Sequence, residues 1–104
     1  MPKTSSIRVE KIRASAAEAA TMLRSLAHRD RLLLLCQLSH EELCVSELEE
    51  QLDIHQPSLS QQLGILRREG LVATRREGKH IYYRIRDRRV LALLQTLYQL
   101  YCAP

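Results

Sequence analysis

Two helical segments separated by only about four residues constrain the fold of this chain more than any other feature. The first covers residues 46–52, where Ser46 is the expected N-cap and acidic residues follow in the first turn. The second covers residues 57–69, with Pro57 as a first helical residue and Gly70 as its end. This spacing is typical of a helix-turn-helix motif.

The pattern of the sequence changes after Gly70. Two short runs, 71–76 and 80–84, flank Glu77-Gly78-Lys79, and alternation of Ile81, Tyr83 and Ile85 continues the second run. Such runs around a glycine-containing turn predict a β-hairpin. The hairpin is rich in basic residues, namely Arg75, Arg76, Lys79, His80 and Arg84.

Three further helices are expected around this unit. Residues 12–26 repeat small and apolar residues at helical spacing, and residues 29–38 contain the apolar run LLLLCQL. Asp87 can cap a last helix, residues 88–101, that is apolar on more than one side. We assign its second apolar side to another copy of the chain, so that the first and last helices form a homodimer. Residues 1–10 are expected to be a flexible arm.

The expected fold is therefore mainly α with a small β-hairpin, a winged helix-turn-helix with about five helices and a two-stranded wing. With 104 residues, the chain is expected to form a single domain, residues 1–104. Gly64, inside the second helix of the motif, is expected to mark a close helix crossing, because glycine costs about 1 kcal/mol in a helix interior.

In this fold the second helix of the motif would enter the major groove of double-stranded DNA. Its exposed polar side chains can hydrogen-bond bases or phosphates, whereas a solvated surface is the alternative interpretation. The net charge of +4 and an isoelectric point near 9.3 favour a polyanionic partner. The candidate DNA-binding residues are Gln56, Ser58, Ser60, Gln61 and Gln62 on the helix, and Arg76, Lys79 and His80 on the wing. Leu59, Leu63 and Leu66 form the opposite, core-facing stripe.

Other functional classes find little support in the sequence. The four histidines are scattered and a glycine-rich phosphate loop is absent, so we expect no enzyme, no catalytic residue and no cofactor. No apolar stretch approaches the roughly 20 residues that span a bilayer, and we expect a cytoplasmic protein without a membrane partner. In that compartment three cysteines suggest packing, metal binding or redox sensing.

The segments LRSLAHRDRLLLLCQL and VSELEEQLDIHQPSLSQQLGILRREGLVATRREGKHIYYRI resemble the ArsR-type winged-helix repressors, and the resemblance extends over nearly the whole chain. It implies a homodimer that binds an operator near its own or neighbouring promoters and leaves it when an inducer binds. By position, Gln56, Ser58, Ser60 and Gln61 fall where this family contacts DNA.

The metal sites of that family are incompletely represented. In ELCVSEL, Cys44 matches the first cysteine of a CxC pair, but Ser46 replaces the second, which weakens a thiolate site for arsenic, cadmium or lead. A second family site needs histidine near and along the last helix; Asp87 remains, yet residues 81–104 contain no histidine. We therefore assign no metal site, although a metal- or metalloid-responsive repressor using Cys44 or Cys36 stays open as an alternative.

The thiol-sensing branch, comprising SqrR-, BigR- and HlyU-like persulfide sensors and their relatives, is the better match. Cys36 in LLLLCQL and Cys102 in LYCAP occupy its two cysteine positions. The resemblance implies that reactive sulfur species, as inducer, join the two redox-sensing thiols and release DNA. A disulfide needs Cα atoms within about 7 Å, and each inserted sulfur adds roughly 2 Å of reach. Two alternatives remain: the protein is a general oxidant-sensing regulator that forms a disulfide, or Cys36 is an inert cysteine buried in the core.

Overall fold

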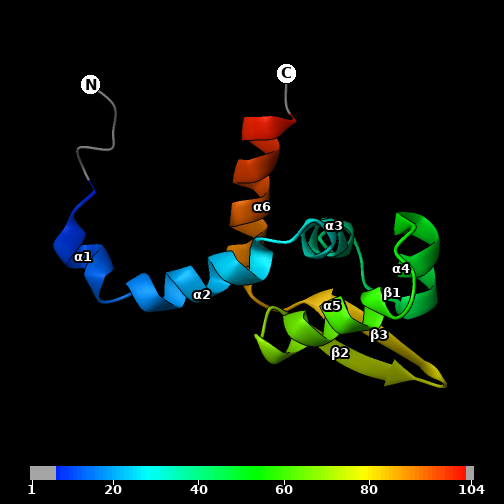
Figure 1. The fold of residues 1–104 in the computed structure, drawn as a ribbon. Coiled ribbons are helices and arrows are strands. Elements are labelled where there is room, and N and C mark those ends of the chain that lie inside the picture. The colour runs from blue at the N-terminus through cyan, green and yellow to red at the C-terminus, as the bar shows by residue number, and fades with distance from the viewer. Residues whose placement is uncertain (1–6, 103–104) are drawn as a thin grey trace.

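The structure, a computed structural model, describes residues 7–102 and is a winged helix-turn-helix (Figure 1). Within these residues it has six helices and a three-stranded antiparallel sheet, which confirms the expected mainly α class and the hairpin. The elements are α1 (Val9–Arg13), α2 (Ala16–Leu26), α3 (Arg29–Leu38), β1 (Leu43–Cys44), α4 (Val45–Leu52), α5 (Ser58–Arg68), β2 (Val72–Glu77), β3 (His80–Ile85) and α6 (Arg88–Tyr101).

The hydrophobic core lies around α3, which contributes the fully buried Leu34 and Leu35. The stripe predicted on α5 is confirmed, because Leu59, Leu63 and Leu66 all lie in this core. Burying a leucine side chain stabilises a fold by about 1.5–3 kcal/mol, so this stripe fixes the inner face of α5. In Figure 1, α5 and the β2–β3 hairpin lie below α3, while α6 rises on the opposite side.

The wing is the predicted hairpin with one additional strand. β2 and β3 pair from Val72 opposite Ile85 to Glu77 opposite His80, and Gly78 takes a φ of 63° in the turn. β1 pairs with the other edge of β3, so that β3 is the central strand. The sequence did not predict β1 because two residues carry no recognisable alternation.

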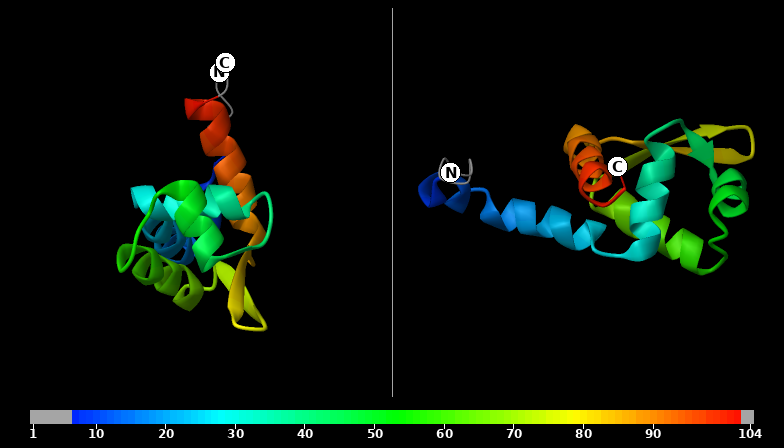
Figure 2. Two further views of the ribbon diagram at one scale, coloured as in Figure 1. Left: turned by 90° about the vertical axis from the view of Figure 1, so that its right-hand side faces the viewer. Right: turned by 90° about the horizontal axis from the view of Figure 1, so that it is seen from above.

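The N-terminal helix differs from expectation. Residues 12–26 form two helices, α1 and α2, because Ser15 has a backbone conformation outside the helical region (φ −107°, ψ 1°). The break was not visible in the spacing of small residues, since none of the side chains of α1 is buried. Val9 and Glu10, which we expected in the arm, belong to α1, and residues 1–6 lie outside the described residues. Figure 2 shows α1 and α2 extending away from the other helices.

The N-cap of α4 is Cys44, and the expected cap Ser46 lies inside the helix. Strand β1 runs directly into α4, and at this junction the backbone N–H of Cys44 donates to Glu47 Oε1 at 3.0 Å. At the other end, Asp53 ends the helix in the left-handed conformation with φ 56°. Helix α5 begins one residue later than expected, with Pro57 as its N-cap.

The interpretation of Gly64 as a close helix crossing is wrong. A Cβ atom built on Gly64 would meet only the end of the Arg68 side chain, at 3.4 Å from its Nη1. No packing contact among the described residues therefore explains why glycine, a residue of low helix propensity, stands at this position.

Candidate nucleic-acid interface and thiol pair

Of the five residues predicted to contact DNA from the second helix of the motif, three are exposed to solvent at or just before the N-terminal half of α5. Gln56, Ser60 and Gln61 are exposed, and Ser58 is half-buried. The side chain of Gln56 accepts a hydrogen bond from the backbone N–H of Ser60 at 3.1 Å, which occupies one of the free donors at the start of the helix. The exposed residues Ser60 and Gln61 and the buried leucines therefore lie on opposite sides of α5, as predicted.

Gln62 is the exception among the predicted polar contacts. Its side chain is buried, and its Oε1 accepts a hydrogen bond from Arg31 Nη1 at 2.8 Å. The expectation that Gln62 faces DNA is therefore wrong. Sequence reasoning missed the reason, because the partner lies 31 residues earlier in the chain.

The basic residues of the wing differ in whether a carboxylate pairs with them, and Arg75 and Arg84 both pair with Glu42. Arg75 bonds Glu42 Oε1 at 2.7 Å and also pairs with Glu77, and its guanidinium lies 4.8 Å from the centroid of the Tyr82 ring. Two carboxylates therefore offset its charge. The wing residues predicted to contact DNA, Arg76, Lys79 and His80, are exposed at or beside the Gly78 turn.

The three cysteines are free thiols in different surroundings. Cys36 on α3 and Cys102 at the end of α6 are exposed, whereas Cys44 is buried. Although Cys36 is exposed as a residue, desolvation of its thiol raises its pKa, and the negative charge of Cys102 raises it further. The two thiols are therefore near enough to influence each other electrostatically. Cys36 lies at the surface, which argues against the alternative interpretation of an inert cysteine buried in the core.

The negative charge of Cys102 should affect the pH at which the Cys36 thiol becomes reactive. We expect Cys102→Ser to lower the pKa of Cys36, because the negative charge that disfavours its thiolate is removed. Iodoacetamide alkylation of Cys36 should therefore reach its maximal rate at a lower pH in this variant. The measurement is the alkylation rate against pH, followed by peptide mass spectrometry with buried Cys44 as internal reference. Identical pH profiles in both proteins would show that the two thiols do not interact.

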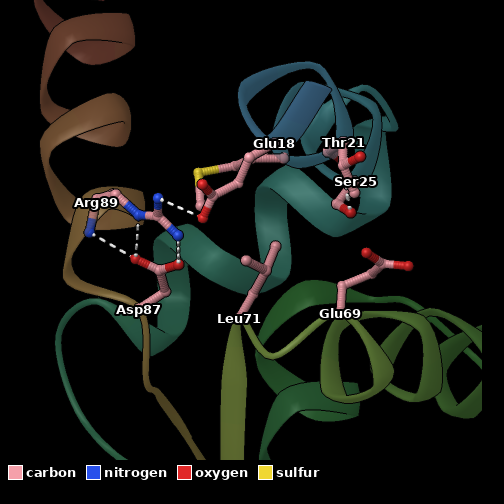
Figure 3. A pocket seen from close by; sticks show the side chains of 8 residues that line it. Glu18, Thr21, Ser25, Glu69, Leu71, Asp87 and Arg89 are labelled. Atoms are coloured by element: carbon pink, nitrogen blue, oxygen red, sulfur yellow. Dashed lines mark hydrogen bonds and ion pairs between the residues drawn. The ribbon is translucent and has the colours of Figure 1, made fainter. Parts of the chain in front are cut away.

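At the start of α6, Asp87 is committed to a structural role. Its Oδ1 accepts the backbone N–H of Arg89 at 3.0 Å, which confirms the predicted cap, and its Oδ2 pairs with Arg89 Nη2 at 2.7 Å. The side-chain hydrogen bond from Arg89 is the main reason that the pKa of Asp87 is lowered. Arg89 also reaches Glu18 on α2 at 3.1 Å, across a pocket that these residues line (Figure 3).

Metal ligands do not gather in the described part of the chain. Within residues 7–102 there is no group of three or more His, Cys, Asp or Glu side chains arranged to hold an ion. The described helices also include none that is long and apolar enough to cross a membrane.

A helix-turn-helix packed on a leucine core, with an exposed polar helix face and a basic hairpin tip, defines the class of winged-helix DNA-binding proteins. Residues 28–74 match the family described as "Bacterial regulatory protein, arsR family". The chain belongs to this family of transcriptional regulators, whose relatives are DNA-binding proteins and not enzymes.

Individual relatives agree with this membership. The chain is 52% identical to the biofilm growth-associated repressor of Agrobacterium fabrum, over 86% of this chain and 76% of the relative. It is 37% identical to the transcriptional activator HlyU of Vibrio cholerae, over 96% and 93% of the two chains. The crystal structure of the transcriptional repressor BigR from Xylella fastidiosa superposes with a TM-score of 0.89 at 44% identity, covering 94% of this chain and all of that one.

Proposed function

We propose that this DNA-binding transcriptional regulator is a repressor that leaves its operator when reactive sulfur species join Cys36 to Cys102. The observation that carries the proposal is the placement of two free surface thiols, from α3 and the end of α6, within electrostatic reach of each other. Similarity to the biofilm growth-associated repressors and to BigR supports the regulatory class. Buried Cys44 is not part of the proposed pair.

The proposed reaction uses a persulfide as the oxidant. The Cys36 thiolate attacks the outer sulfur of a persulfide, RSSH, and the products are Cys36–SSH and the thiol RSH. The Cys102 thiolate then attacks Sγ of Cys36, which forms a disulfide and releases hydrogen sulfide. If Cys102 is also persulfidated, the two persulfides condense to a trisulfide with loss of hydrogen sulfide. Longer bridges tolerate a larger distance between the two Cα atoms.

Loss of DNA affinity would follow from the position of α3. This helix carries Cys36 and packs directly on α5, the helix proposed to read DNA. Two recognition helices in a dimer must lie about 34 Å apart to occupy successive major grooves. A bridge from α3 to α6 would change the orientation of α5 relative to the dimer axis and so disturb this spacing.

The proposed dimer uses the first and last helical elements. The large apolar side chains that the structure leaves exposed lie on or beside α1, on α2 and on the second half of α6, namely Ile7, Val9, Ile12, Leu23, Tyr98, Leu100 and Tyr101. Large apolar side chains that are left exposed together are typical of a protein–protein interface. A second copy of the chain would cover it.

The proposed DNA contacts are Gln56, Ser58, Ser60 and Gln61 on α5 together with the three exposed wing residues. On the wing, adjacent arginines allow a direct test. Arg76→Ala should reduce the slope of log affinity against log salt by about one, because one phosphate contact is lost. Arg75→Ala should change the slope less, since Glu42 and Glu77 already neutralise Arg75. Equal slopes for both variants and the wild type would exclude a phosphate contact by Arg76.

The inducer is tested on one set of samples. Reduced protein is treated separately with glutathione persulfide, hydrogen peroxide and arsenite, and its intact mass and its affinity for a duplex selected from random DNA by the wild-type protein are measured. Persulfide should give a Cys36–Cys102 bridge and release the duplex. Release by peroxide alone would indicate a general oxidant sensor, and release with bound arsenic would indicate a metalloid-responsive repressor using Cys44 or Cys36.

A further inference from the structure

One arginine joins three helices of the molecule. Arg31, in the first turn of α3, donates from Nε to the carbonyl oxygen of Ser25 at 2.6 Å and from Nη2 to that of Arg24 at 3.2 Å. Its third donor, Nη1, reaches Oε1 of Gln62 on α5 at 2.8 Å. The guanidinium thus connects the last turn of α2, the start of α3 and the middle of α5.

The chemistry of each partner suits a guanidinium. The last carbonyl groups of a helix lack partners within the helix and carry partial negative charge, so a cation at the end of α2 stabilises that end. Arginine presents several N–H donors in a fixed plane, and it can bond two carbonyls and a side-chain amide at once. Lysine has only a point charge and lacks this geometry.

The bond to Gln62 fixes the rotation of α5 about its own axis. Gln62 is buried beside Leu63, while the preceding residues Ser60 and Gln61 are exposed. Each residue of an α-helix is rotated by about 100° from the previous one, so holding Gln62 inward holds Gln61 and Ser60 outward. The leucine stripe fixes the inner face of α5 by burial, and the bond to Gln62 adds a directional restraint at this point.

We propose that Arg31 is a positioning residue for DNA recognition: it holds α5 in the orientation that presents Ser60 and Gln61, without contacting DNA itself. The inference rests on the proposed DNA contacts of α5 and adds to them a determinant of affinity away from the DNA-contacting surface. It also assigns Gln62 a function as the acceptor of this bond.

The chain contains a matched control for Arg31. Arg29 lies in the same turn of α3 with the same charge, but it is exposed, and its bond at 3.0 Å is to the adjacent Asp30. Arg29→Met removes one positive charge from α3 without touching α2 or α5. Comparison with Arg31→Met therefore separates loss of the three-helix connection from loss of charge.

The test uses the full chain and the selected DNA duplex, with affinity, salt slope and thermal unfolding measured for Arg31→Met, Gln62→Met, the double variant and Arg29→Met. We expect Arg31→Met and Gln62→Met each to weaken binding about tenfold, and the double variant to be no weaker than the stronger single effect, as for residues that act through one bond. The salt slope should stay that of the wild type, because no phosphate contact is lost. The backbone amide resonances of Ser60 and Gln61 should shift in the free variants.

Two results would overturn the inference. Wild-type affinity of folded Arg31→Met and Gln62→Met would show that the bond does not position α5, and a salt slope reduced by about one in Arg31→Met would show that Arg31 contacts a phosphate. If Arg31→Met fails to fold, Gln62→Met decides, because it leaves both bonds to α2 in place. Gln61→Ala, measured in parallel, tests the proposed DNA contact itself, so that failure of that contact is distinguishable from failure of the positioning role.

Discussion

Replacing Cys36 with serine is expected to leave DNA binding intact and to abolish its loss on treatment with persulfide. Serine has nearly the shape of cysteine and, on the exposed side of α3, disturbs no core contact. Its hydroxyl cannot accept a sulfur from a persulfide, so the proposed bridge cannot form. In the wild type, bridging should weaken binding by about 5–150-fold, the usual range of coupling between two sites. The affinity for the selected duplex, before and after glutathione persulfide, measures both quantities.

Two other serine variants complete this experiment. Cys44→Ser is the matched control, and it should respond like the wild type because Cys44 is buried and lies outside the proposed pair. Cys102→Ser should still accept sulfur at Cys36 but form no bridge, and it should therefore keep its DNA. Release of DNA from persulfide-treated Cys36→Ser would show that the switch lies elsewhere in the chain.

Placing a charge on the exposed apolar part of α6 is expected to have the second large effect. Leu100 is 71% exposed, so Leu100→Glu should leave the fold of the single chain unchanged. In the proposed dimer this side chain is covered, and burying an unpaired carboxylate there is strongly unfavourable. We expect a monomer whose affinity for a two-fold DNA site is lower by about 100-fold or more, because the two half-sites are then bound independently.

Sedimentation equilibrium and binding to the selected duplex provide the measurement. Gln99→Glu is the control, since it introduces the same charge at an exposed polar neighbour. We expect Gln99→Glu to remain dimeric, which would show that an added charge on this part of α6 does not by itself disrupt the dimer. A dimeric Leu100→Glu that binds DNA normally would move the interface away from this part of α6.

The elements that local sequence determines were predictable. The apolar stripe of α5, the Asp87 cap of α6 and the hairpin turn at Gly78 each depend on residues within a few positions of one another. Such local features are predicted directly by apolar periodicity, capping residues and turn residues. The exposed polar side of α5 follows from the same stripe.

Features that depend on distant residues were not predictable. The inward orientation of Gln62 needs Arg31, and the neutralisation of Arg75 needs Glu42, 33 residues away in the chain. Strand β1 exists because β3 lies beside it, and its own two residues carry no signal. Pattern alone also gives no distance between Cys36 and Cys102, so at the level of the sequence only the family resemblance implies their proposed pairing.

The short strand β1 has a mechanical consequence. It pairs with β3 of the wing and continues without interruption into α4, where Cys44 is at once the end of the strand and the cap of the helix. The wing and the first helix of the helix-turn-helix are thereby joined firmly, and little relative motion between them is available. In the proposed dimer, we therefore expect a bridge between Cys36 and Cys102 to tilt the wing and α4 together, with their mutual arrangement unchanged.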